Sequence, residues 1–236
     1  NVFLRKYIEE CTFAPDILLK NKQVWVDNLS INSSHDDWSP CLSADGELLI
    51  FTSNRKNENI VNEIGLYDQD IYCSNLSGRN FNTVISLSEL NTSTDDVSGG
   101  LSYDGQRLLI YKEEGGNTDI FESKLNGSLW GETNRKFGAK LKGGNTSMNE
   151  TFASFDPPDI KVYYITDGGY SGNQDIYFSG VMNKERNIWG KGQSAGVVNS
   201  KFQEGSVYIH PDARTMYFSS KGHNSLGGYD IFVSYV

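Results

Sequence analysis

The sequence predicts an all-β protein built from four repeats, each of four short strands. A set of short signatures recurs four times in the same order, at steps of 54 to 59 residues. Glycine is abundant, with 24 residues, and many glycines stand beside Asn or Asp, as in tight turns. A period of this length that carries four strands is typical of a β-propeller blade.

The repeat begins with an asparagine that follows an apolar or small residue and precedes Ser or Thr. This asparagine is Asn32, Asn91, Asn145 and Asn199 in the successive repeats. A carboxylate follows five residues later, at Asp37, Asp96, Glu150 and Glu204. A turn, an apolar run and the motif Asp-Ile-aromatic come next, and the motif begins at Asp70, Asp119, Asp175 and Asp230. The constant order excludes chance recurrence.

These signatures predict the strands of each blade. The first strand runs from the carboxylate to the turn, which reads "SADG" at 43–46 and "SYDG" at 102–105. Asp and Gly tolerate positive φ, so this turn predicts a hairpin into the apolar second strand, which suits burial on both faces. The third strand begins at Asp-Ile-aromatic, and the fourth precedes the next asparagine. The third turn, "DPPD" at 156–159, departs from the pattern and predicts a different turn type.

The predicted blades cover residues 37–91, 96–145, 150–199 and 204–236, within a propeller of residues 23–236. Residues 1–22 are predicted to form a short helical lead-in. Residues 24–31 have the pattern of the fourth strand of a blade, but no first, second or third strand precedes them. The last repeat has its first three strands and lacks the fourth. Because an unpaired edge is a pairing hazard, we expect 24–31 to pair with the last strand and close the ring. A four-bladed ring and part of a five-bladed ring both remain open.

Composition excludes several classes of function. The net charge of −9 and the pI of about 4.8 disfavour binding to nucleic acid. No apolar run approaches the ~20 residues needed to cross a bilayer, so this segment is not expected to span a membrane. Cys41 and Cys73 fall on strands separated by a third, about 9–10 Å apart, which exceeds the ~7 Å limit for a disulfide. Both are expected to be buried free thiols, and Cys11 to be free.

The repeated carboxylates Asp37, Asp96, Glu150 and Glu204 fall on the innermost strand of each blade. A ring of carboxylates could hold a hard cation such as calcium. Alternatively, each carboxylate accepts hydrogen bonds from backbone amides in the crossover between blades. Strict repetition favours the second interpretation, and the aspartates that begin each third strand are interpreted in the same way, as caps. No catalytic, cofactor or metal residue is therefore assigned.

Motifs of hydrolases are absent from the sequence. It contains no Gly-x-Ser-x-Gly elbow, no His-Glu-x-x-His and no phosphate loop. We therefore expect a protein that is not an enzyme. A propeller hydrolase is kept as an alternative, which would need two inward carboxylates in unlike environments.

Features outside the repeat are the candidates for partner binding, because the blade does not explain them. They are the enlarged loop at 54–69 and the glycine-rich loop at 221–229, which contains His223, Asn224 and Tyr229. Trp130 and Trp189 follow the third strands of their blades. They either contact a protein or sugar partner or pack between blades.

The stretches "SPCLSADGELLIFTSNR" and "IHPDARTMYFSSKGHNSLGGYDIF" resemble the TolB-type, WD-like propeller repeats of bacterial envelope proteins. The resemblance covers about residues 24–236. The chain is most similar to the propeller of Bacteroidetes outer-membrane proteins that carry an OmpA-like module, a group that includes PorE of type IX secretion. Such proteins usually continue into a fifth blade.

The resemblance implies a non-enzymatic scaffold in a Gram-negative envelope, periplasmic and associated with the outer membrane, with a role in type IX secretion or gliding. The implied partners are envelope or outer-membrane proteins, and no cofactor is implied. Binding of carbohydrate or peptidoglycan is the first alternative function.

Overall fold

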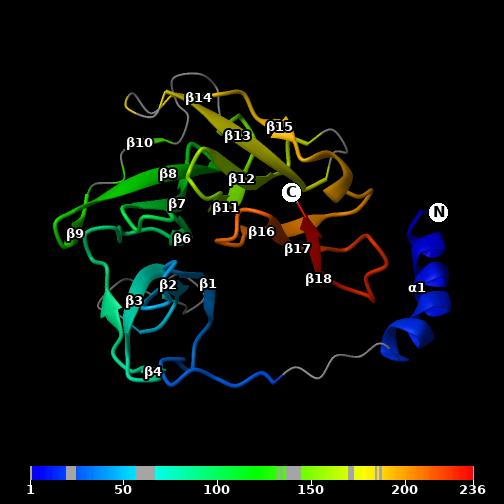
Figure 1. The fold of residues 1–236 in the computed structure, drawn as a ribbon, viewed down its shortest axis with the longest axis horizontal. Helices are drawn as coiled ribbons and strands as arrows, with labels where there is room; N and C mark the ends of the chain where they lie inside the picture. The colour runs from blue at the N-terminus through cyan, green and yellow to red at the C-terminus, as the bar shows by residue number, and fades with distance from the viewer. Residues whose placement is uncertain are drawn as a thin grey trace.

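Four antiparallel sheets follow one another along the chain and lie around a common axis, with one helix beside them (Figure 1). The computed structural model describes residues 2–19, 25–56, 67–131, 133, 135–136, 145–169, 173–183, 185 and 188–235. Each sheet starts at its innermost strand and continues outward in chain order. This arrangement confirms the predicted propeller with four blades.

The blades share the order of their strands. The first contains β1 (Asp37–Leu42), β2 (Leu48–Ser53), β3 (Asp70–Ser77), β4 (Asn80–Phe81) and β5 (Ile85–Ser86). The second contains β6 (Asp96–Leu101), β7 (Arg107–Glu114), β8 (Asn117–Asn126), β9 (Leu129–Trp130) and β10 (Arg135–Lys136). The third contains β11 (Glu150–Phe155), β12 (Lys161–Thr166), β13 (Asp175–Asn183), β14 (Ile188–Trp189) and β15 (Gln193–Ser194), followed by the 3₁₀ helix η1 (Gly196–Val198). The fourth contains β16 (Glu204–Ile209), β17 (Thr215–Ser220) and β18 (Asp230–Tyr235).

The predicted fourth strand of each blade is short. β5 and β15 are two-residue strands that pair with the middle of β3 and β13. In the second blade, the strand expected before Asn145 falls mainly on residues 137–144, which lie outside the described residues. β10, just before that gap, pairs with β8.

The hydrophobic core lies between successive blades. Ile50 of β2 and Leu108 of β7 belong to one cluster, and Leu109 and Tyr164 join the second and third blades in another. A third cluster joins Ile165 to strands β16 and β17. The second strands supply many of these residues, because both of their faces are covered, as their apolar sequence predicts. Burial of apolar surface therefore fixes each blade against its neighbour.

The hairpin turns between first and second strands all need a residue with positive φ. Gly46 and Gly105 supply it in the first two blades, with φ of 77° and 69°. Asp159 and Ala213 take the same place in the other blades, with φ of 66° and 56°. The "DPPD" turn thus keeps the left-handed residue of the other turns and differs in the cis bond between Pro157 and Pro158.

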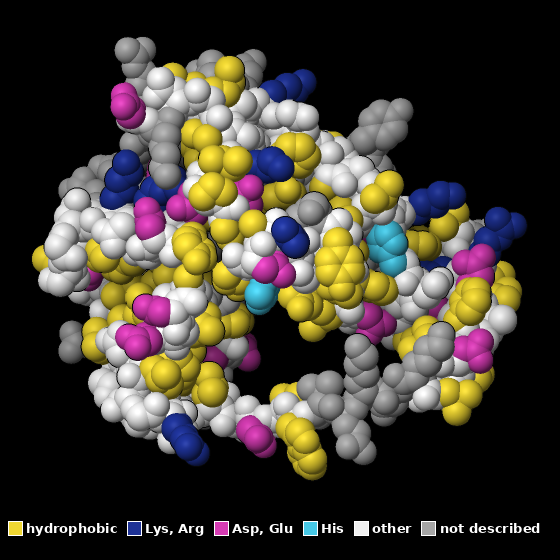
Figure 2. All heavy atoms as spheres, in the orientation of Figure 1, with side chains coloured by type: hydrophobic (Ala, Val, Ile, Leu, Met, Phe, Trp, Pro, Cys, Tyr) yellow, Lys and Arg dark blue, Asp and Glu magenta, His cyan; other side chains and the backbone are white. Residues whose placement is uncertain are grey.

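The predicted closure of the ring by residues 24–31 is wrong for this structure. Residues 25–31 form no strand, and among the described residues β18 pairs only with β17. The segment is instead anchored on the first blade, where Ile31 is buried beside Leu49 and the hydroxyl of Ser30 donates to the carbonyl of Phe81. An opening therefore separates β18 from this segment, and Figure 2 shows it as a hollow beside the fourth blade.

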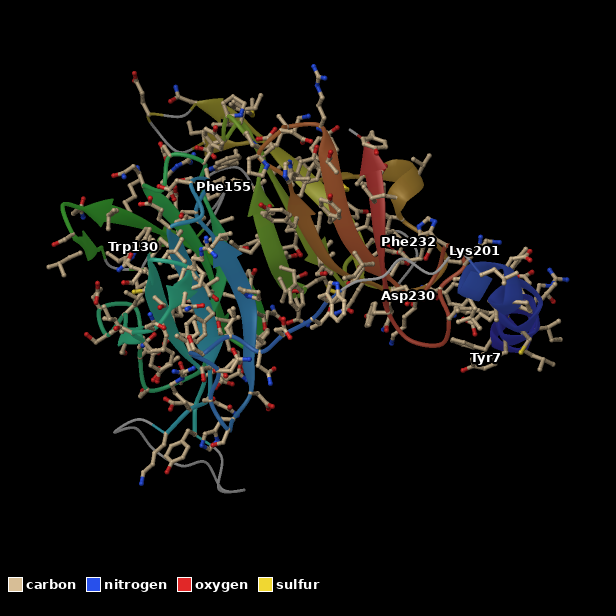
Figure 3. All side chains as sticks on the ribbon, turned by 60° about the horizontal axis from the view of Figure 1, so that its bottom comes forward. Tyr7, Trp130, Phe155, Lys201, Asp230 and Phe232 are labelled. Atoms are coloured by element: carbon tan, nitrogen blue, oxygen red, sulfur yellow. The ribbon has the colours of Figure 1, made fainter. Side chains whose placement is uncertain are left out.

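The predicted N-terminal helix is present as α1 (Val2–Leu19). It lies at a corner of the fourth blade, near Lys201 and Asp230 (Figure 3). The ring of Phe3 packs edge-on against Phe202 at 6.0 Å. Lys6 Nζ donates to Ser225 Oγ at 3.2 Å. These contacts hold the helix on the far side of the opening from the first blade.

Candidate functional site

The innermost strands β1, β6, β11 and β16 surround the axis of the propeller. The pairing of each with its second strand shifts register at a bulge within the inner strand. Bulges change the direction of side chains and let neighbouring strands approach closely. At Gly100 of β6, an added Cβ would lie 2.7 Å from the carbonyl oxygen of Ala153 on β11. The bulges therefore shape the wall of the axial channel.

A cavity of about 380 Å³ lies at one end of the channel. We call it the turn-side cavity, because it is lined by the ends of the inner strands and by the hairpin turns that follow them. Its lining includes Cys41, Leu42, Ala44, Leu101, Tyr103, Phe155, Pro157, Tyr208, Ile209, Pro211 and Tyr217. All four blades contribute, and the side chains in this list are uncharged.

Three exposed tyrosines contribute to the aromatic character of the turn-side cavity. Tyr103, Tyr208 and Tyr217 are 53%, 44% and 41% exposed. Figure 2 shows hydrophobic side chains gathered over the fourth blade, which carries two of these tyrosines. An aromatic ring that carries a hydroxyl can pack against an apolar ligand and also form a hydrogen bond. Such residues are common where proteins bind other proteins.

Two carboxylates also line the turn-side cavity, and both are engaged by the fold. Asp156 Oδ1 accepts from the backbone N–H groups of Ile160 and Lys161 at 3.0 and 2.6 Å. Burial raises the pKa of Asp156. Asp159 Oδ1 accepts from Tyr103 N at 3.0 Å, and its Oδ2 lies 3.2 Å from Arg107 Nη2. These bonds give both carboxylates a structural role in the third turn.

A second cavity, of about 210 Å³, lies at the opposite end of the channel. We call it the crossover-side cavity, because residues from the beginnings of β1, β6 and β11 line it, next to the crossovers between blades. Its lining is Trp38, Gln69, Asp95, Val97, Tyr111, Lys112, Glu113, Thr118, Thr151 and Phe152. Tyr111 and Phe152 line both cavities. Their rings therefore lie between the two ends of the channel.

The repeated carboxylates accept hydrogen bonds in the crossover, as the favoured interpretation states. Each accepts from the backbone N–H of the residue after the repeat asparagine, four positions upstream: Ser33 to Asp37, Thr92 to Asp96, Thr146 to Glu150 and Ser200 to Glu204. None of the four appears in the described lining of either axial cavity. Within the described residues, no group of three or more His, Cys, Asp or Glu side chains could hold a metal ion.

The partners of these carboxylates differ between the two halves of the chain. Arg55 Nη2 lies 2.7 Å from Asp37, and Lys112 Nζ lies 2.8 Å from Asp96. In the later blades a hydroxyl replaces the cation, since Thr166 and Ser220 donate to Glu150 and Glu204 at 3.1 and 2.9 Å.

The pKa values of these carboxylates differ accordingly. Burial raises the pKa of both glutamates, Glu150 and Glu204. Burial also acts to raise the pKa of Asp37, but hydrogen bonds from Ser33, Ser53 and Arg55 bring it below its usual range.

The repeat asparagines have a role that the sequence analysis missed. Asn91, Asn145 and Asn199 each hold the isoleucine of the preceding blade's Asp-Ile-aromatic motif, by accepting from its N–H and donating to its C=O. We call this arrangement the asparagine clamp. Asn32 forms no such bond with a described residue. The constant order of the Asp-Ile-aromatic motif and the following asparagine, which recurs in three repeats at separations of 20, 25 and 23 residues, was the signal that could have revealed the clamp.

The aspartates that begin the third strands are buried in three of the blades. Asp70, Asp119 and Asp175 are each less than 5% exposed. In the fourth blade, Asp230 Oδ2 accepts from the backbone N–H of Leu226 at 2.5 Å, which is the predicted cap between loop and strand. These positions lie at the junctions between loops and strands.

Of the residues expected to contact a partner, the two tryptophans are in the core. Trp130 is 7% exposed and packs between the first two blades (Figure 3), and Trp189 is 1% exposed between the second and third. The fold buries these large apolar rings in the contacts between blades, so they are not available on a surface. Packing, the other interpretation in the sequence analysis, fits their positions.

The other expected residues lie at the surface of the 221–229 loop. His223 and Asn224 are exposed, and the His223 ring packs 5.7 Å from Phe218 while its Nε2 lies 2.9 Å from the carbonyl of Val198. Tyr229 is exposed beneath the ammonium group of Lys221, which lies 4.7 Å from the ring centroid. In the other expected loop, residues 57–66 lie outside the described residues.

The cysteines agree with the prediction. All three are free thiols, with Cys41 and Cys73 buried and Cys11 exposed. Burial raises the pKa of the Cys41 thiol to about 12.

Comparison with solved structures shows which known proteins have a similar fold. The chain is similar to TolB from Acinetobacter baumannii, with a TM-score of 0.59 and 16% identity over 87% of this chain and 42% of that one. The chain has the β-propeller fold seen in TolB. A putative TolB from Agrobacterium tumefaciens matches with a TM-score of 0.51 and 12% identity, over 86% of this chain and 78% of that one.

An α-L-arabinofuranosidase from Lactobacillus brevis has a comparable likeness, with a TM-score of 0.51 and 10% identity over 84% of this chain and 72% of that one. The chain thus spans less than half of the first of these proteins and about three quarters of the other two. No protein-family model matches the sequence, and no curated protein matches it. No helix among the described residues is long and apolar enough to cross a membrane.

Proposed function

We propose that this propeller is a non-enzymatic protein-interaction module of a Gram-negative cell envelope. The observation that carries the proposal is the turn-side cavity, in which uncharged and aromatic side chains from all four blades converge on one hollow. A concave, largely apolar surface with hydroxyl groups at its rim suits a segment of a protein partner. The two carboxylates in the cavity are already engaged, Asp156 by backbone N–H groups that follow its turn and Asp159 by Tyr103 N and Arg107 of the second blade, which supports binding in preference to hydrolysis.

The proposed location in the cell envelope is based on the resemblance of the repeats to propellers of bacterial envelope proteins. The fold of TolB supports this placement in part, since both chains are propellers of the same kind. A periplasmic location associated with the outer membrane, and a scaffolding role in type IX secretion or gliding, are the finer parts of the proposal. Partners are then expected among envelope or outer-membrane proteins.

Photo-cross-linking in the native envelope tests the proposal. Benzoylphenylalanine replaces Tyr208 at the turn-side cavity or, as a matched control, Tyr7 on α1, which is 55% exposed. We expect the probe at position 208 to capture one envelope protein that the probe at position 7 does not capture. Capture of that protein should also decrease when Tyr217 is replaced by Ala. Equal capture from both positions, or no capture from position 208, would contradict the proposal.

Binding of a glycan at the same cavity is the second candidate. The exposed tyrosines at its rim favour it, because sugars pack on aromatic rings and bond to hydroxyls. Calorimetric titration with soluble peptidoglycan fragments distinguishes the two functions. Binding that is lost in Tyr208→Ala and kept in Tyr7→Ala would support the glycan, whereas no heat of binding would leave the protein partner as the occupant.

A further inference from the structure

We propose that the crossover-side cavity binds a basic side chain of a protein partner, with arginine preferred over lysine. This site is separate from the turn-side cavity and does not depend on what that cavity binds. Its walls are aromatic and its rim carries uncompensated acidic groups. A cation is the chemical group that both features recognise.

The aromatic wall is built from residues that depart from the repeat. Phe152 occupies the position held by Ser39, Ser98 and Ser206 in the other blades. Its φ is 49°, close to the 47° of the equivalent Ser39, but this conformation is more costly for a bulky side chain than for serine. Strain of this kind persists where the surrounding structure requires it and is concentrated at functional sites. Part of Phe152 packs against the core cluster between the third and fourth blades, and the side chain also lines the cavity.

A second departure from the repeat meets Phe152 across the channel. Trp38 occupies the position of Val97, Thr151 and Gly205 in the other blades. The Trp38 and Phe152 rings lie 6.4 Å apart in a T-shaped arrangement, and Tyr111 lies 6.2 Å from Phe152. Rings from the first, second and third blades thus surround one hollow. Trp38 and Phe152 are only partly buried, so their surfaces are available to a ligand.

The rim of this cavity supplies negative charge. Glu113 is exposed, and its side chain forms no hydrogen bond or ion pair with any described residue. Its counterparts Asn54 and Asp167 each accept a backbone N–H, from Asp36 and Asn149. Asp95 is also exposed, and it is held in place because its Oδ1 accepts from Gln69 N at 2.9 Å. Two carboxylates therefore line the same opening, and neither forms an ion pair with a described residue.

Among the described lining residues, the one cation is already neutralised. Lys112 Nζ lies 2.8 Å from Asp96 Oδ1 and 3.3 Å from the carbonyl oxygen of Leu90. Its charge is therefore matched by a buried carboxylate, and the cavity keeps the negative charge of Glu113 and Asp95. The net charge of −9 on the whole chain adds attraction for a basic partner. Arginine is preferred because its planar guanidinium stacks on rings and pairs with carboxylates at once.

Titration followed by NMR tests this site with the whole chain. The probes are two capped pentapeptides, Gly-Gly-Arg-Gly-Gly and the same peptide with citrulline, which has the shape of arginine without its charge. The reporter is the indole N–H resonance of Trp38, assigned from Trp38→Phe. We expect the arginine peptide to shift this resonance in a saturable way that weakens with added salt, and the citrulline peptide to leave it unchanged.

Two charge-matched variants separate a local site from general attraction. Glu113→Gln removes a carboxylate at the cavity, and Glu47→Gln removes an exposed one at the other end of the first blade. We expect affinity for the arginine peptide to fall roughly fivefold in Glu113→Gln and to stay within a factor of two in Glu47→Gln. Equal losses in both variants, or equal shifts with both peptides, would overturn the proposal. A failure of the cross-linking experiment at position 208 would not bear on it, because the two cavities lie at opposite ends of the channel.

Discussion

The side chain of Asn199 holds both main-chain groups of Ile176 in the preceding blade. Asn199 Oδ1 lies 2.7 Å from Ile176 N, and its Nδ2 lies 2.9 Å from Ile176 O. Asn91 and Asn145 hold Ile71 and Ile120 in the same way. Ile176 O also accepts from the N–H of Ala195, just after the short fourth strand, so the asparagine adds a second donor there and supplies the acceptor for Ile176 N.

The asparagine clamp predicts that replacing the repeat asparagine by alanine lowers stability by different amounts in different repeats. Asn199→Ala removes both hydrogen bonds to Ile176 and the bond to Ser194 Oγ, and it leaves the N–H of Ile176 without this acceptor, while Ile176 O still accepts from Ala195 N. We therefore expect a loss of about 2–3 kcal/mol in the free energy of unfolding. Asn32→Ala should cost less than about 0.5 kcal/mol, because Asn32 forms no clamp with a described residue. Denaturation in urea measures both. A loss for Asn32→Ala as large as that for Asn199→Ala would show that the ring closes onto Asn32 in solution.

Glu204 and Asp37 occupy the same repeat position but should respond to pH in opposite directions. Burial raises the pKa of Glu204 above its ordinary value of 4.5, so it stabilises the fold below that pH and loses the contribution as pH rises through the raised pKa. The pKa of Asp37 lies below its ordinary value of 3.8, so its contribution is present above that pH and is lost as pH falls through the lowered pKa.

Unfolding free energies of Glu204→Gln and Asp37→Asn, measured against the wild type between pH 3 and pH 7, test this difference. The stability of Glu204→Gln relative to the wild type should improve as pH rises. That of Asp37→Asn should worsen over the same interval. Parallel changes in the two variants would contradict the assigned environments.

Close approach of two inner strands makes Gly100 intolerant of a side chain. In Gly100→Ala the new Cβ would lie 2.7 Å from the carbonyl oxygen of Ala153 and 2.9 Å from the Cα of Ser154. Backbone of β11 must then move, and we expect a loss of about 2–3 kcal/mol of stability. Gly228→Ala is the matched control, since a Cβ there meets nothing within 4 Å. Equal melting temperatures for the two variants would be evidence against this packing of β6 on β11.

The thiols should differ in reactivity by position. Only Cys11 is exposed, whereas Cys41 and Cys73 are buried and the pKa of Cys41 is raised to about 12. A thiol reagent at pH 8 should therefore label one cysteine per chain in the native protein and three after unfolding. Cys11→Ser should abolish the native reaction. Rapid labelling of Cys41 in that variant would show that the channel opens on the time scale of the reaction.

Much of the fold followed from the sequence because each repeat contains its own local signals. The apolar runs placed β2, β7, β12 and β17, and the Asp-Ile-aromatic motif placed the start of β3, β13 and β18. Closure by residues 24–31 was not predictable in this way, because pairing of an edge depends on where distant elements lie. Burial of Ile31 on the first blade competes with that pairing, and a strand pattern alone does not show which of the two prevails.

The candidate cavities were harder to predict than the blades. The exposed tyrosines of the turn-side cavity come from the second and fourth blades, and their convergence on one hollow depends on how the blades are assembled. The departures at Trp38 and Phe152 were visible in the aligned repeats, but their contact required the ring to be assembled. Trp130 and Trp189 were candidates for contact with a partner, but their large rings pack in the core between blades.

The asparagine clamp also orders the folding of the chain in time. Ile71, Ile120 and Ile176 are held by asparagines 20, 25 and 23 residues further along. During synthesis from the N-terminus, the third strand of a blade therefore keeps unsatisfied main-chain groups until the crossover into the following blade has emerged. A blade is therefore complete only when the crossover that follows it is present. Nascent chains should gain protection from proteolysis in steps, each at the chain length at which the crossover after a blade has emerged.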